Sequence, residues 1–341
     1  MTYVADDWRI ATAMLPFPNV TADGRSVQDV DASYWCDVFG EVADAGFRDV
    51  DLTDCWVRIG DLSPSRLDEF ATAMREADVV AAGVSAIRCS VIDSHCGDEN
   101  LAYSHRTIDA AAHLGCAVVS VGLHQQLTPA QKRRLWFWTL PGHVDPADDA
   151  DTWRLAVRRL RELGEHAAEV GLLLSLEMYE DTYLGTADSS VRLVEDIGLS
   201  NVGLNPDLGN LVRLNRPVES WHEMAVKTLP YTNYWHVKNY LRYEDPDRDC
   251  YLAMPATLQD GVINYRELIR LATAVGFQGI ICTEHYGGDG LSVCAANREY
   301  LRSRILPARP DYRLGESRVL QVAPVEAATG DGQAVKELAH G

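Results

Sequence analysis

Four short apolar runs in the C-terminal half of the chain constrain its fold more than any other feature. Each run has the length of a buried parallel strand and is too short for a helix, and amphipathic helical sequence separates the runs. Three of the runs lead directly into a carboxylate, and the fourth carries a histidine. The four polar residues are Glu177, Asp207, His236 and Glu284.

The same strand–helix alternation extends toward the N-terminus and predicts an α/β protein with eight repeating units. The expected fold is a single (β/α)8 TIM barrel over residues 1–306, followed by a C-terminal extension, 307–341, that forms a tail or an arm docking on another subunit. Further strands are predicted at 8–14, 47–52, 79–87 and 117–121. Helices are predicted at 32–45, from Ser63, and at 100–114, 151–170, 186–197, 217–229, 264–275 and 291–305.

Two long segments interrupt the alternation. The first is an insertion after the fourth strand, residues 124–147, which contains Trp136, Phe137 and Trp138 in sequence. The second is a segment without helical period, residues 240–260, which we expect to be a loop. Loops of this length inside a compact domain usually have a functional role.

Residues that follow barrel strands converge on one mouth, where catalytic groups lie. Three carboxylates and one imidazole at that mouth predict an oxygen-rich site for one divalent cation, with Mn²⁺ preferred and Mg²⁺ or Co²⁺ as alternatives. Without a cation, the three carboxylates would repel one another and their pKa values would rise. Taken singly, each acid has an alternative explanation, since a strand-end carboxylate can also cap a helix or bind a loop amide.

Composition excludes several kinds of partner. The net charge of −19 argues against binding to nucleic acid, because phosphate backbones require basic surfaces. No apolar stretch is long enough to span a membrane, and the N-terminus does not resemble a signal peptide. Eight cysteines occur without a C-x-x-C motif. We therefore expect a cytoplasmic protein with reduced thiols.

The four polar residues, together with the run His-Val-Lys-Asn from His236, resemble the sugar-phosphate isomerase/epimerase superfamily of xylose-isomerase-like barrels. The resemblance covers about residues 8 to 305. It implies one metal held by Glu177, Asp207, His236 and Glu284, with Glu177 and Glu284 also able to act as acid/base groups. Arg242 follows His236 by six residues, where keto-sugar epimerases place a substrate-binding arginine.

Two positions depart from the pattern of those epimerases. Asn210 replaces a histidine and Tyr183 replaces a glutamate. With the insertion and the extension, these changes make the chain resemble the catalytic subunit of C-glycoside deglycosidases, which act on 3-oxo-glycosides together with a small second subunit. The alternative is a sugar or sugar-phosphate isomerase or epimerase that acts on a ketose.

The chemistry of such a cleavage requires a base beside the carbon next to a ketone. His143 of the insertion is our candidate, with Asp145 two residues further on. An exposed loop histidine without a catalytic role is the alternative. Trp136, Phe137 and Trp138 either face a flat aglycone or pack beneath the insertion.

Other side chains near the strand ends are candidates for substrate binding. Lys238 lies two residues after His236, so both side chains point to the same face of a strand. It either binds a substrate hydroxyl or pairs with a neighbouring carboxylate. His124, Asn210 and His285 complete this group. A DNA-repair nuclease would need more histidine ligands and a basic groove, and a non-catalytic subunit would leave the four polar residues unexplained.

Overall fold

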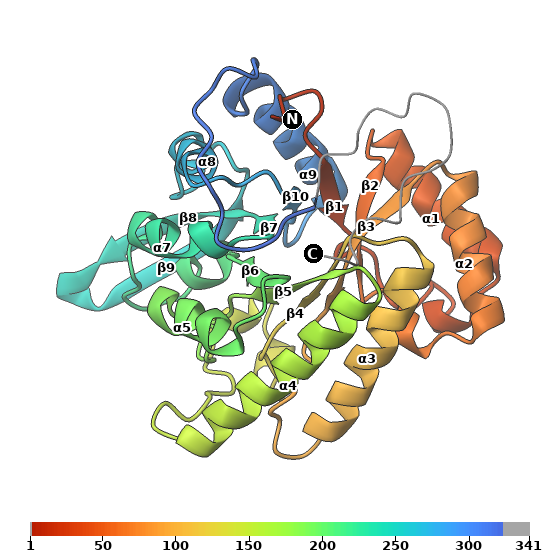
Figure 1. The fold of residues 1–341 in the computed structure, drawn as a ribbon, viewed down its shortest axis with the longest axis horizontal. Helices are drawn as coiled ribbons and strands as arrows, with labels where there is room; N and C mark the ends of the chain where they lie inside the picture. The colour runs from red at the N-terminus through yellow and green to blue at the C-terminus, as the bar shows by residue number, and fades with distance from the viewer. Residues whose placement is uncertain (1, 323–341) are drawn as a thin grey trace.

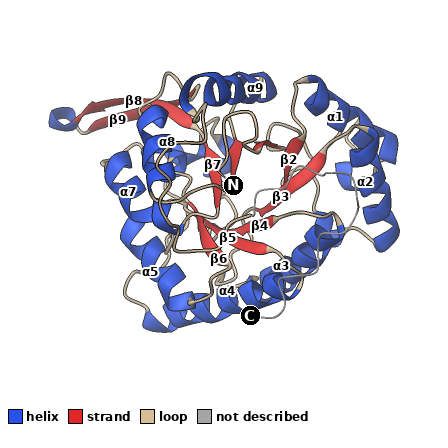
Figure 2. Cartoon of the chain, turned by 45° about the horizontal axis from the view of Figure 1, so that its top comes forward, coloured by secondary structure: helices blue, strands red, loops and turns tan. Residues whose placement is uncertain are grey.

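A computed structural model describes residues 2–322 and arranges eight parallel strands into one sheet that curls into a nearly closed barrel (Figures 1 and 2). The strand order is β6-β5-β4-β3-β2-β1-β10-β7, and an isolated parallel bridge between Leu204 and Thr232 joins the two ends. This confirms the predicted TIM barrel. The strands are β1 (Ile10–Ala13), β2 (Asp49–Thr53), β3 (Val80–Ala86), β4 (Val118–Val121), β5 (Leu173–Glu177), β6 (Val202–Asn205), β7 (Tyr234–Val237) and β10 (Ile280–Thr283).

Helices surround the barrel and mostly begin and end where the sequence signals predict (Figure 2). Ser63 caps α2 by accepting a hydrogen bond from the Arg66 amide, and Asn264 caps α8 in the same way through Glu267. Gly171 follows α4 with a φ of +79°, a conformation that favours glycine. The helices are α1 (Ala32–Asp44), α2 (Pro64–Glu76), α3 (Gly97–His113), α4 (Ala150–Glu169), α5 (Ala187–Ile197), α6 (Gly209–Val212), α7 (Trp221–Thr228), α8 (Tyr265–Ala274) and α9 (Gly290–Tyr300).

Small residues inside the barrel make room for one large side chain. Ala11, Ala13 and Ala82 share an apolar cluster with Tyr234, and a Cβ on Gly83 would lie 3.4 Å from the Tyr234 ring. The Tyr234 hydroxyl donates a hydrogen bond to Asp51 on β2. The barrel interior is therefore packed below the site and becomes polar toward the C-terminal ends of the strands.

The prediction of a loop over residues 240–260 is wrong. This segment forms an antiparallel hairpin of β8 (Asn239–Asp245) and β9 (Cys250–Ala256), which projects from the barrel (Figures 1 and 2). The missed signal is the turn sequence Asp245-Pro246-Asp247 between two runs that contain tyrosine, a residue type that is enriched in strands. A short 3₁₀ turn (Pro246–Arg248) connects the strands.

The insertion 124–147 contains only two short 3₁₀ turns, at Gln131–Arg133 and Phe137–Thr139. Tyr183 ties it to the barrel, because its hydroxyl donates to the Pro146 carbonyl and its amide donates to Asp145.

The C-terminal extension packs on its own chain as far as it is described, and the Leu320 amide donates to the Ser200 carbonyl. Residues 323–341 lie outside the described part. Among residues 2–322, no helix has both the length and the hydropathy needed to cross a membrane.

Candidate metal centre

The barrel brings the four predicted ligands together at the C-terminal ends of neighbouring strands. Glu177 ends β5, Asp207 follows β6, His236 lies in β7 and Glu284 follows β10. One candidate ligand atom from each residue lies within 4.8 Å of the other three, and all four residues are buried. These residues lie far apart in the sequence, but the curvature of the sheet brings the ends of their strands together.

Lys238 lies among the carboxylates. Its Nζ is 2.6 Å from Asp207 Oδ2 and 2.8 Å from Glu284 Oε1. Burial alone would lower the pKa of Lys238, but Asp207 and Glu284 raise it well above the usual range. The ammonium group therefore offsets one of three negative charges, and the salt bridge considered as an alternative for this residue is present in the structure.

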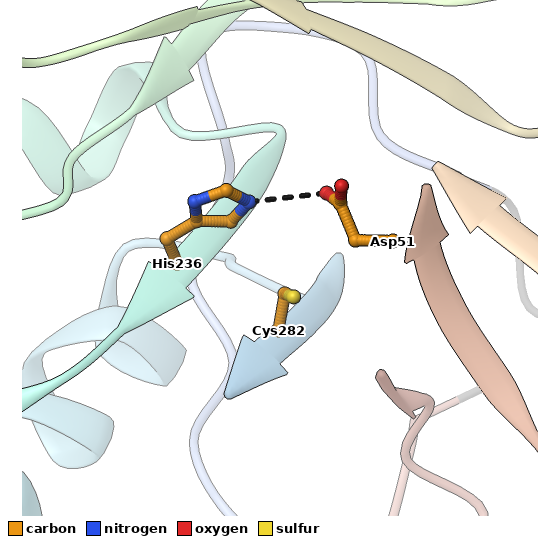
Figure 3. Close-up of side chains that lie close together, drawn as sticks. All are labelled: Asp51, His236 and Cys282. Carbon is orange, nitrogen blue, oxygen red and sulfur yellow. Dashed lines mark hydrogen bonds and ion pairs between the residues drawn. The ribbon is translucent and has the colours of Figure 1, made fainter. Parts of the chain in front are cut away.

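Figure 3 shows how Asp51 fixes the orientation of His236. Asp51 Oδ2 lies 3.1 Å from His236 Nε2, and it also accepts hydrogen bonds from the hydroxyls of Tyr234 at 2.5 Å and Ser85 at 2.8 Å. A carboxylate can only accept, so His236 carries a proton on Nε2. Its Nδ1 then faces Glu284 Oε2 at 3.2 Å and Glu177 Oε1 at 3.9 Å. Cys282, opposite His236 on β10, completes this buried group.

The residues fit a divalent cation. His236 Nδ1 and Asp207 Oδ1 are both buried without a hydrogen-bond partner among the described residues. Buried polar atoms are rarely left unpaired, and a cation would satisfy both. Three carboxylates and one imidazole form a donor set that is rich in oxygen, as Mg²⁺ and Mn²⁺ prefer.

The pKa values of the two glutamates shift in opposite directions. Burial raises the pKa of Glu177 to about 7, and the charges of Asp207 and Glu284 add to this rise while His236 opposes it. Burial would raise the pKa of Glu284 as well, but Lys238 and His236 outweigh it and hold the pKa below its usual range. Asn210 donates hydrogen bonds to Glu177 Oε1 and to the Met178 carbonyl, both at 3.0 Å. Asn210 thus lies in the site and orients a predicted ligand.

His143 and His124 lie in a separate cavity of about 130 Å³ beside the four ligands, none of which lines it. His143 Nε2 is 3.4 Å from Asp145 Oδ1, and 41% of its side chain is exposed. The His124 ring stacks on Tyr179 at 4.4 Å between centroids. Burial, and then the charges of Arg88, Arg213 and Lys238, lower the pKa of His124 well below its usual range. The insertion therefore forms one wall of a pocket next to the site.

The aromatic side chains of the insertion pack mainly on one another and on the barrel. The Trp138 ring lies 5.0 Å from Trp136, 5.6 Å from Tyr240 and 5.3 Å from Tyr286. Trp138 is buried, yet it also lines the cavity. Beneath it, the guanidinium of Arg213 forms a buried ion pair with Glu180. Trp138 thus packs against Tyr240 and Tyr286, which follow β7 and β10 at the C-terminal end of the barrel.

Two predicted substrate-binding residues lie apart from the ligands. The Arg242 guanidinium donates to the carbonyls of Val212 at 2.8 Å, Leu214 at 2.6 Å and Arg216 at 2.6 Å. β8 directs the Arg242 side chain toward the segment that follows α6, and these three hydrogen bonds hold that segment in place. His285 is half-buried and belongs neither to the ligand cluster nor to the lining of the cavity. Burial lowers its pKa.

The sequence reasoning missed the residues that support His236. Asp51, Ser85 and Tyr234 come from β2, β3 and β7, and Asn205 of β6 accepts a hydrogen bond from the His236 amide at 2.7 Å. A carboxylate in the middle of an apolar strand, as in Val50-Asp51-Leu52, was the available signal. A buried charge in such a position needs a partner.

The model of the xylose isomerase-like TIM barrel family matches residues 39–304. The chain belongs to this family. It is 46% identical to a xylose isomerase-like TIM barrel protein from Mycobacterium smegmatis, solved in complex with magnesium, with a TM-score of 0.84 over 88% of this chain and 97% of that one. No curated protein matches the chain.

Solved structures with lower sequence identity share the fold. A xylose isomerase domain protein from Planctomyces limnophilus is 17% identical, with a TM-score of 0.64 over 87% of this chain and 98% of that one. The 3-keto-D-glucoside 4-epimerase YcjR from E. coli is 15% identical, with a TM-score of 0.59 over 87% of this chain and 99% of that one. At these identities the likeness concerns the barrel alone.

Proposed function

We propose that this family member is a divalent-metal-dependent enzyme that removes the proton beside the ketone of a keto-sugar. The observation that carries the proposal is the buried set of three carboxylates and one imidazole, in which Asp207 Oδ1 and His236 Nδ1 have no hydrogen-bond partner among the described residues. Lys238 alone does not balance these charges. A site of this kind is costly unless a cation occupies it.

Glu177, Asp207, His236 and Glu284 would hold the metal. When bound there, the cation would supply Lewis acidity that polarises the ketone oxygen of a substrate and so acidifies the neighbouring C–H bond. Magnesium in the Mycobacterium smegmatis relative supports a hard cation, and we propose Mn²⁺ or Mg²⁺, with Co²⁺ as a third choice.

The side chains divide the remaining tasks. Asp51 keeps a proton on His236 Nε2 and so leaves Nδ1 free. Asn210 holds Glu177 in one orientation, and Lys238 places a positive charge where negative charge develops on the substrate oxygen. Glu177 and Glu284 come from opposite sides of the cluster and are the groups that we propose to move protons.

The specific reaction that we propose is cleavage of the carbon–carbon bond between the sugar and the aglycone of a 3-oxo-glucoside. A base removes the proton at C2, the C1–C2 double bond forms, and the electrons of the C1–aryl bond leave with the aglycone carbon, which takes up a proton. We propose His143 as the base. Support comes from its position in a cavity beside the four ligands, where Asp145 can stabilise a protonated imidazole.

This lyase proposal includes a small second subunit, as in the enzymes that the sequence resembles. The second candidate function is a keto-sugar isomerase or epimerase. It is supported by the fold shared with a 3-keto-D-glucoside 4-epimerase. In that reaction Glu177 and Glu284 would exchange a proton with two faces or two carbons of one sugar.

The test is an incubation of metal-loaded protein in D₂O with a 3-oxo-C-glucoside and, separately, with a set of free ketoses, read by mass spectrometry. The assay is run with and without any small protein encoded beside this one. Release of free aglycone is the expected result. Deuterium in a ketose or its epimer, with an intact glycoside, would favour the second candidate. A protein that exchanges no proton in either substrate and binds no divalent metal would refute both.

A further inference from the structure

The outer face of the β8–β9 hairpin is apolar, although it points away from the barrel. Leu241, Tyr243, Leu252 and Met254 are 49%, 55%, 54% and 59% exposed. They form two directly opposed pairs, Leu241 with Met254 and Tyr243 with Leu252. A solvent-exposed face of an antiparallel sheet normally carries polar residues, whereas this exposed face carries apolar side chains.

The inner face of the hairpin already has its partners. Tyr240 and Ala253 are buried, and Arg242 is bonded to three carbonyls of the chain after α6. The hairpin is a sheet of two strands within residues 2–322, and it extends beyond the helices of the barrel (Figures 1 and 2). Two-stranded ribbons are only marginally stable unless further packing covers them.

We propose that this outer face joins two copies of the chain in a dimer with two-fold symmetry. Four large side chains that are about half exposed present roughly 400 Å² of apolar surface, about half of the ~800 Å² that each partner contributes to a stable interface. The patch thus supplies the apolar centre, and polar residues around it supply the rim. In a two-fold contact the same patch meets itself, so one surface serves both copies.

Charge favours a second copy as the occupant. Each chain has a net charge of −19, so two copies repel one another wherever their acidic surfaces meet. The four patch residues are uncharged, and the exposed acidic residues of the hairpin, Glu244, Asp247 and Asp249, lie toward its tip, where Asp245 pairs with Arg248 at 3.4 Å. A second copy that meets this patch therefore places no carboxylate at the centre of the contact.

The test is the mass of the full-length protein in solution, measured by analytical ultracentrifugation over a micromolar concentration series. We expect a dimer of twice 37.8 kDa for the wild type. Leu252→Glu should raise the dissociation constant by at least about tenfold, because it places like charges at the centre of the interface. Leu252→Thr keeps strand propensity and should weaken the dimer in the same direction, which guards against an effect of misfolding.

The matched control is Val226→Glu, which introduces the same charge at a 51% exposed apolar residue of α7. It should leave the dimer intact. Two results would overturn the proposal: a wild-type protein that stays monomeric over the whole series, or a dimer that Leu252→Glu and Val226→Glu weaken equally. Folding of each variant is checked by circular dichroism, and the metal site need not be active for the measurement.

Discussion

Asp51→Asn tests whether a carboxylate behind His236 prepares this residue to bind a metal. In the native site, Asp51 Oδ2 faces three donors, at 2.5 Å from Tyr234, 2.8 Å from Ser85 and 3.1 Å from His236. Asparagine has nearly the same shape but carries no charge, and one of its two polar atoms is a donor. The substitution therefore changes the electrostatics of His236 with little change in packing.

The loss of metal affinity depends on which of two orientations the new side-chain amide adopts. If its oxygen takes the place of Oδ2, the proton stays on His236 Nε2 and only the charge assistance is lost. If its nitrogen takes that place, it donates to Nε2, so the proton moves to Nδ1 and blocks the free ligand atom. Loss of such supporting groups typically weakens metal binding about 10- to 100-fold, which corresponds to ~1.4–2.7 kcal/mol.

Isothermal titration of Mn²⁺ and Mg²⁺ into metal-free protein measures this loss directly. Long-range ¹H–¹⁵N NMR correlations of His236 report which ring nitrogen carries the proton. Asp49→Asn is the matched control, because Asp49 lies on the same strand and pairs with Arg9 away from the metal cluster. Equal metal affinity in Asp51→Asn and the wild type, or an equal loss in Asp49→Asn, would refute the proposed role of Asp51.

Three further predictions follow from the same geometry. Glu177→Gln and His236→Ala should each abolish proton exchange in the D₂O assay, and retained turnover in either variant would contradict the proposed chemistry. Lys238→Met should lower the unfolding free energy of the metal-free protein by about 3–5 kcal/mol, because it leaves buried carboxylates unpaired. Urea unfolding measures this loss and should show that Mn²⁺ restores most of it. An unchanged stability of the metal-free variant would disprove the prediction. Burial raises the pKa of Asp54 to about 6. The folded state therefore binds more protons than the unfolded state between about pH 4 and 6, and unfolding free energy falls by roughly 2 kcal/mol as pH rises through this window. Asp54→Asn should remove that fall, and identical pH profiles of the two proteins would argue against it.

Much of the barrel could be predicted because its signals are local. Helix caps such as Ser63 and helix ends such as Gly171 depend on a few neighbouring residues, and buried strands are recognisable as apolar runs. The hairpin was missed because both of its faces carry apolar residues, so neither arm shows the polar–apolar alternation of a half-buried strand. Residues 217–220 were expected to be helical, but α7 begins only at Trp221.

For the candidate site, the sequence predicted the positions of the residues but not their chemical roles. Glu177, Asp207, His236 and Glu284 could be found because each stands where an apolar run ends, and barrel strands direct such positions to one mouth. Their role as metal ligands stays a prediction, as do the roles of His143 and the other substrate-binding candidates. The small second subunit and the cytoplasmic location are likewise untested.

The sequence by itself determined the strand–helix order, and with it the fold and the convergence of the four polar side chains. Only the tertiary structure decided which atoms face one another. It placed Asp51 behind His236, Lys238 between Asp207 and Glu284, and Arg242 on backbone carbonyls. Periodicity specifies which face of a strand a side chain occupies, whereas the contact between residues far apart in sequence depends on the curvature and stagger of the closed sheet.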